Sequence, residues 1–162
     1  MERFEERLKR AIDRGQRRSA SRLEQERVAA MSEEDLKNLH GKYRLSLSDH
    51  IELCVRNMPV HFPGFEFKTT YGSAGWGASC SRDDFGQLND GNRTSLFSRL
   101  EMAIRPYSSL HVLELAAKGT VRNKEIYNRT HFEKLEEADT ETFRELIDVW
   151  VLEYAELYAA SS

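Results

Sequence analysis

The residues that most resemble a ligand-binding motif are the glycines of positions 72–77, which read GSAGWG. Exposed backbone amides in such a run can bind phosphate. A Walker loop, however, ends in a lysine and a hydroxyl residue, and both it and a Rossmann turn open a helix. Here the chain continues with strand-like alternation. We therefore interpret the run as the turn of a β-hairpin, and keep only Trp76 as a candidate contact for a ligand or partner.

Histidine, cysteine and acidic residues form no motif that we can assign to catalysis or metal binding. No two of the five histidines are four residues apart, the spacing that places two imidazoles on one helix face. Cys54 and Cys80 belong to no CxxC pattern, so we expect buried thiols and neither a disulfide nor a zinc site. Segment 83–95 carries oxygen ligands, but not at the spacing of an EF-hand. We predict no catalytic residue, no metal and no cofactor.

A second group of candidate site residues is charged and lies on one predicted strand. Arg99, Glu101 and Arg105 fall on one side of segment 96–105, because alternate residues of a strand share a face. If that face is open to water, they form ordinary cross-strand pairs. If helices cover it, the buried charges need partners and a polar ligand site follows. We favour the open face, and retain Arg99, Glu101 and Arg105 with Trp76 as candidate contacts.

Helical periodicity marks both ends of the chain. The N-terminal pattern predicts a helix over 2–14 and a restart over 21–31, as one kinked helix or two. A helix over 33–40 should stop at Gly41, and another should run from Ser48 or Asp49 to Pro59. Near the C-terminus, a capping box at Thr130 predicts a helix of about two turns. The clearest helix starts at Asp139 or Thr140 and carries a wide apolar stripe.

The middle of the chain has the period of two that is typical of strands. We predict strands over 65–71, 76–81, 96–105 and 110–117, with a shorter fifth over 121–127, and a loop over 83–95. The predicted fold is therefore α+β: a four- to five-stranded antiparallel meander sheet with helices packed on one face. Residues 1–44 should form an N-terminal helical arm, and residues 45–162 the α+β domain.

The formal net charge of −3 conceals opposite signs at the two ends. The arm is rich in arginine and the last helix in acids, so the two can attract each other within one molecule or between two. The arginines are interleaved with acids, so we do not expect nucleic-acid binding. The chain has neither an apolar run of membrane-spanning length nor the apolar core of a signal peptide, and we expect a cytoplasmic protein without a membrane partner.

These observations favour a function in binding over one in catalysis. Our first hypothesis is a non-catalytic protein-interaction or adaptor module that self-associates, with a homodimer as the expected form. The alternative is a small-molecule-binding protein or enzyme with a polar site between the sheet and the helices. That site would use Trp76, Arg99, Glu101 and Arg105.

Overall fold

The chain divides into two compact units, residues 1–36 and 37–162. The structure is a computed structural model that describes residues 2–29, 32–87 and 91–161. Where the sequence suggested an arm that ends at residue 44, the boundary between the units lies inside a helix, α2 (Glu33–His61). None of the described helices has an apolar stretch of the length that a lipid bilayer requires.

The first unit consists mainly of α1 (Glu2–Ala29), a single uninterrupted helix. The sequence left open one kinked helix or two, and the helix continues through Gly15. Ion pairs one turn apart support it, among them Arg17 with Asp13 at 2.9 Å and Arg27 with Glu24 at 2.6 Å. Such exposed pairs contribute only a few tenths of a kcal/mol each. The predicted restart reached residues 30 and 31, which lie outside the described residues.

The helix α2 joins two segments that the sequence analysis separated. Ser32 Oγ accepts a hydrogen bond from the Asp35 amide at 3.1 Å, which starts the helix as predicted. The predicted stop at Gly41 is wrong, as is the end at Pro59: the helix continues to His61. The reason is tertiary packing, because the part of α2 that belongs to the second unit buries a stripe of apolar side chains at helical spacing. The members of that stripe are Leu47, Ile51, Val55 and Met58.

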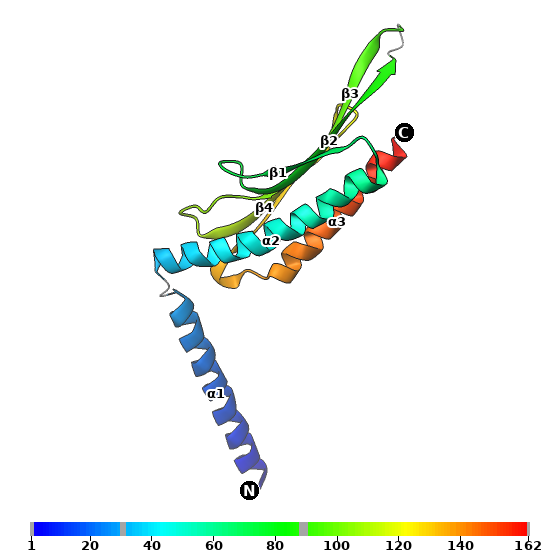
Figure 1. Ribbon diagram of the computed structural model, residues 1–162. Helices are drawn as coiled ribbons and strands as arrows, with labels where there is room; N and C mark the ends of the chain where they lie inside the picture. The colour runs from blue at the N-terminus through cyan, green and yellow to red at the C-terminus, as the bar shows by residue number, and fades with distance from the viewer. Residues whose placement is uncertain (1, 30–31, 88–90, 162) are drawn as a thin grey trace. The chain divides into compact units, whose positions relative to one another are not determined.

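The sheet is a five-stranded antiparallel meander, as predicted (Figure 1). Each strand pairs with its neighbour in the sequence. In spatial order the strands are β1 (Glu66–Thr70), β2 (Trp76–Gln87), β3 (Arg93–Ile104), β4 (Val112–Val121) and β5 (Lys124–Lys134).

Two predicted interruptions of the sheet are wrong. Most of segment 83–95 is strand and not loop, because β2 continues to Gln87 and β3 begins at Arg93, with Asp83 opposite Phe97. A hydrogen bond from Ser95 Oγ to Asp83 Oδ1 at 2.9 Å joins the two strands there, while residues 88–90 lie outside the described residues. The helix predicted at Thr130 is strand, because His131 pairs with Leu115 of β4. Only a single 3₁₀ turn, Leu135–Glu137, follows.

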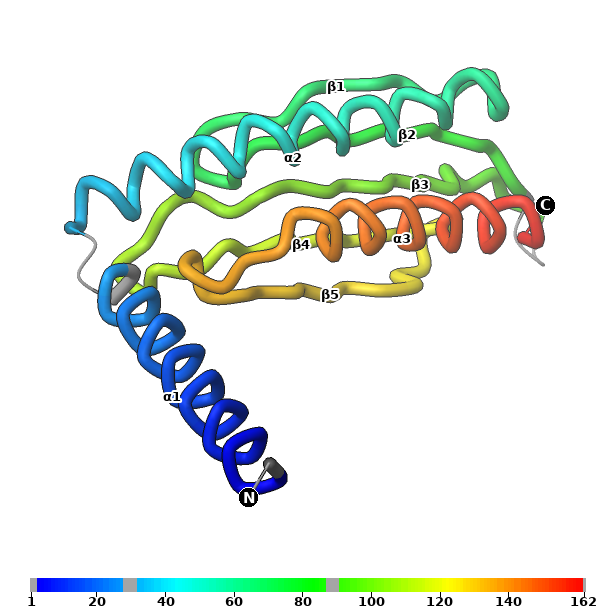
Figure 2. The backbone as a smooth tube through the Cα atoms, turned by 90° about the horizontal axis from the view of Figure 1, so that it is seen from below, coloured from blue at the N-terminus to red at the C-terminus, as the bar shows by residue number. Residues whose placement is uncertain are grey.

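The last helix, α3 (Thr140–Ala160), begins where the sequence predicted. Asp139 caps it by accepting a hydrogen bond from the Glu141 amide at 3.1 Å. Both long helices of the second unit lie on the same face of the sheet, α2 over β1 and β2 and α3 over β4 (Figure 2). The stripe on α3 is buried against the strands and consists of Phe143, Ile147, Trp150, Val151, Tyr154 and Tyr158.

Candidate functional site

Within the second unit, α2 and α3 lie side by side, and an open groove of about 610 Å³ runs between them. Its lining is mostly apolar, and we call it the α2–α3 groove. Its lining includes Cys54, Met58 and Phe62 from the α2 side and Asp148, Val151 and Leu152 from α3. Clefts of this size are typical of ligand and peptide sites.

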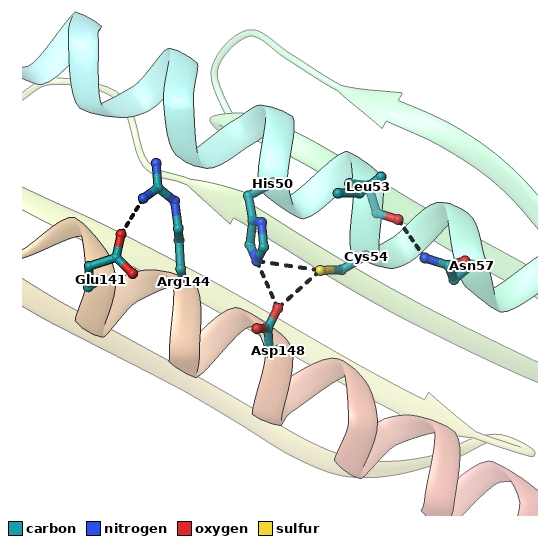
Figure 3. Close-up of polar contacts among 7 residues, drawn as sticks. All are labelled: His50, Leu53, Cys54, Asn57, Glu141, Arg144 and Asp148. Carbon is teal, nitrogen blue, oxygen red and sulfur yellow. Dashed lines mark hydrogen bonds and ion pairs between the residues drawn. The ribbon is translucent and has the colours of Figure 1, made fainter.

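Three polar side chains with metal-binding atoms meet at this groove. His50 and Cys54 are one helical turn apart on α2, so their side chains project from the same face. Asp148 projects toward them from α3 (Figure 3). It follows Ile147, which the core buries completely, and this register places Asp148 at the edge of the helix interface. Two neighbouring helices therefore supply the three groups.

The three donor atoms lie within hydrogen-bonding distance of one another. His50 Nε2 is 2.7 Å from Asp148 Oδ1, and Cys54 Sγ is 3.3 Å from the same oxygen. The distance from Cys54 Sγ to His50 Nε2 is 3.6 Å. The three contacts link the same three atoms, one from each side chain, so these atoms form a compact triangle.

This triangle differs from the arrangement of a catalytic triad. In a triad the carboxylate holds one ring nitrogen of the histidine and the nucleophile contacts the other. Here Cys54 and Asp148 both contact Nε2 of His50. Burial and the hydrogen bond to Asp148 raise the pKa of the Cys54 thiol to about 12. A thiol of this kind stays protonated at neutral pH, so it is a poor nucleophile.

A second polar link joins the same two helices one turn earlier along α3. The guanidinium of Arg144 donates to Ser46 Oγ on α2 at 2.8 Å, and it also pairs with Glu141 on its own helix. Figure 3 shows Arg144 and Glu141 beside the cluster. The position of Asp148 relative to α2 is thus supported by a contact that does not involve the cluster itself.

The candidate contacts named from the sequence are distributed over two faces of the sheet. Trp76 is on the face covered by the helices, where the Arg44 guanidinium lies 4.2 Å from its ring. Arg99 and Glu101 alternate with buried core residues, point to the opposite face and pair at 3.5 Å. That face is not covered by α2 or α3 (Figure 1).

Arg105 lies just beyond the end of β3 and is exposed. Its carbonyl oxygen accepts a hydrogen bond from His40 Nε2 at 3.1 Å. The structure therefore brings Arg99 and Glu101 together, but the four candidates, which include Trp76, do not surround one cavity.

Part of the cluster is visible in the sequence, although none of it was predicted as a site. His50 and Cys54 have the i, i+4 spacing on a predicted helix, a spacing that was considered only for pairs of histidines. Both cysteines were expected to be buried thiols, but only Cys80 is fully buried. Asp148 is 98 residues from His50, and no local pattern connects them.

Comparisons with known proteins add no further assignment to this geometry. The second unit presents an α2–α3 groove with a three-residue polar cluster at its wall, and the sheet presents an open charged face. A function for the groove or for the charged face must therefore be inferred from the chemistry of the residues that form it. No protein-family model, no curated protein and no solved structure matches the chain.

Proposed function

We propose that the protein is a non-catalytic interaction module that self-associates, with α1 of one molecule binding the α2–α3 groove of a second molecule. A cytoplasmic location, expected from the sequence, is part of this proposal. The observation that carries it is the apolar stripe of α1, which is exposed along its whole length. Phe4 is 66 % exposed, Leu8 48 %, Ile12 52 % and Leu23 59 %.

An exposed apolar stripe on a long helix favours burial against a partner. Each of its larger side chains would contribute on the order of 2 kcal/mol if fully buried. A helix turns by about 100° per residue, so arginines follow one edge of this stripe, while Glu6, Asp13 and Glu24 lie on the far side. The arginines of that edge are Arg3, Arg7, Arg14 and Arg18. A suitable partner is therefore an apolar groove with an acidic border.

The charges argue against pairing of α1 with α1 of another molecule. The helix carries nine basic and six acidic residues, so two copies side by side repel each other. The helix α3 has the opposite balance, with five acidic residues and one basic. Charge complementarity of this kind favours and orients association.

A second copy offers the required surface at its α2–α3 groove. Leu152, which lines the groove from α3, is 68 % exposed. On α3, residues 145, 148, 152 and 156 are three or four positions apart, so their side chains share one side of the helix. This side therefore carries the acids Glu145 and Glu156 in addition to Asp148 and Leu152. Apolar side chains with acids beside them match the stripe and arginine edge of α1.

The test is the molar mass in solution, measured by light scattering on matched single variants. We expect the wild-type chain to form a dimer and Leu8→Glu to form a monomer. The control is Lys9→Glu, which adds the same side chain one residue along, off the stripe, and should remain dimeric. Leu152→Glu in the groove should also give a monomer.

Mixing separates this exchange of helices from other dimers. A Leu8→Glu molecule keeps an intact groove and a Leu152→Glu molecule keeps an intact α1, so a mixture of the two should regain part of the dimer mass. A monomeric wild-type protein, or a Leu8→Glu variant with unchanged mass, would contradict the proposal. A dimer that survives Leu152→Glu would show that the stripe is buried elsewhere.

The alternative hypothesis, a polar small-molecule site between sheet and helices, has less support. Of its four residues only Trp76 lies on the covered face of the sheet.

A further inference from the structure

The cluster on the wall of the α2–α3 groove has the composition of a transition-metal site. It combines an imidazole nitrogen, a sulfur and a carboxylate oxygen, and these atoms all lie within 4.8 Å of one another. Thiolate, imidazole and carboxylate are the protein ligands that bind zinc. Calcium and magnesium prefer oxygen alone.

The distances are close to those that a tetrahedral zinc ion imposes. With bond lengths of about 2.3 Å to sulfur and about 2.0–2.2 Å to nitrogen and oxygen, tetrahedral angles separate sulfur and nitrogen by about 3.6 Å. The Cys54 Sγ to His50 Nε2 distance is already 3.6 Å. The same geometry separates the other two pairs by about 3.4–3.6 Å. Asp148 Oδ1, at 2.7 Å from Nε2 and 3.3 Å from Sγ, would thus retreat by less than an ångström.

To bind the metal, His50 and Cys54 can keep their positions, and only the side chain of Asp148 must move. His50 and Cys54 are held by one helix, one turn apart, so their spacing is set by the backbone. The side chain of Asp148 is 52 % exposed, so it has room to adjust. A small shift of the carboxylate is enough to replace its two hydrogen bonds with one metal bond.

We propose that His50, Cys54 and Asp148 bind a zinc ion, with the fourth coordination position open to the α2–α3 groove. On binding, the metal takes the place of the thiol proton, which is released to the buffer, and the sulfur becomes a thiolate ligand. Three protein ligands and one open position form the arrangement of zinc sites that accept water or another ligand. This inference does not depend on self-association.

The test uses Co²⁺ as a spectroscopic probe for zinc, with the full chain in a reducing, chelator-free buffer. We expect saturation at one Co²⁺ per chain, with visible d–d bands and a near-ultraviolet charge-transfer band from a cysteine thiolate. Added Zn²⁺ should abolish both. Titrations repeated in the Leu8→Glu background should give the same result, so failure of the dimer proposal and failure of the metal proposal are distinguishable.

Matched variants assign the ligands. Cys54→Ser should lose the charge-transfer band, and Cys80→Ala should keep it. His50→Gln and Asp148→Asn should weaken binding by more than about 100-fold, because the loss of even outer-shell partners typically costs 10–100-fold in metal affinity. His61→Gln removes a histidine that lines the same groove outside the cluster, and should leave the affinity unchanged.

Folding of each variant is checked by far-ultraviolet circular dichroism, and thermal unfolding gives a second measurement. Zn²⁺ should raise the melting temperature of the wild-type protein and of His61→Gln, but not that of Cys54→Ser or His50→Gln. Absence of saturable Co²⁺ binding would overturn the proposal. So would a charge-transfer band that persists in Cys54→Ser, or equal weakening in His61→Gln and His50→Gln.

Discussion

Replacing Gly41 with alanine should stabilise the protein, although glycine at this point looks like a helix stop in the sequence. Gly41 lies within α2, and its φ is not in the left-handed region, unlike those of Gly64, Gly72, Gly75 and Gly91. A Cβ built on Gly41 meets no atom within 4 Å. The new methyl group therefore costs nothing in the folded state, while the unfolded chain loses backbone freedom.

The expected gain in the free energy of unfolding is about 0.5–1 kcal/mol, the penalty of glycine relative to alanine inside a helix. For a chain of this size that corresponds to a rise in melting temperature of about 1–4 °C. Urea unfolding followed by circular dichroism should show a higher midpoint with an unchanged m-value. Calorimetry gives the melting temperature independently.

The matched control is Gly77→Ala in β2. A Cβ there would overlap the carbonyl oxygen of Met102 and lie 2.8 Å from Ala103 Cα, both of which are backbone atoms that cannot move aside cheaply. We expect a loss of about 1–3 kcal/mol or more. If Gly41→Ala lowered the midpoint instead, α2 would be broken at this glycine, and the continuity of the helix would be refuted.

Three further predictions concern the core. Burial, with a smaller effect of Arg44, lowers the pKa of His40 despite its hydrogen bond to the Arg105 carbonyl. Around and below about pH 6.5 the unfolded state therefore binds more protons than the folded state, so the free energy of unfolding should fall as the pH drops through that value. His40→Gln should flatten this part of the profile of urea stability against pH, and an unchanged slope would count against this role of His40. Tyr154→Phe removes a 2.8 Å hydrogen bond to the Thr120 carbonyl from a fully buried side chain, and should cost about 1–3 kcal/mol of unfolding free energy, whereas Tyr71→Phe on the surface should change nothing. Trp150→Ala should cost about 3–5 kcal/mol and lower the melting temperature sharply; a loss under 1 kcal/mol would mean that Trp150 is not a core residue.

The elements that could be predicted from the sequence are those with one buried face. Phe65 and Phe67 alternate with charged residues as in a strand, and the stripe from Phe143 to Tyr158 has helical period, so both were recognisable locally, although Tyr71 of the same expected strand face is exposed. The errors came where tertiary contacts decide. Segment 83–95 is polar because this part of the β2–β3 hairpin carries few buried side chains, and its strands are held by backbone pairing that no alternation reveals.

The same limit explains the capping box and the candidate site. Thr130 to Glu133 has the composition of a helix start, but pairing with β4 makes it strand, and His131 there contacts Glu133 at 2.7 Å. For the cluster, the spacing of His50 and Cys54 was visible, and their partner was not. Asp148 is one of several acids on α3, and only the docking of the two helices selects it.

The meander has a consequence for how the chain reaches this state. Every strand pairs with its sequence neighbour, so the sheet can form by successive hairpins of short loop closure, which favours rapid folding. The two helices that cover it come from opposite ends of the second unit, and their mutual contacts join residues almost a hundred positions apart. We therefore expect docking of α2 beside α3 to be the late step. A nascent chain whose α3 is still inside the ribosome should expose to chaperones the part of the sheet that α3 covers in the folded protein.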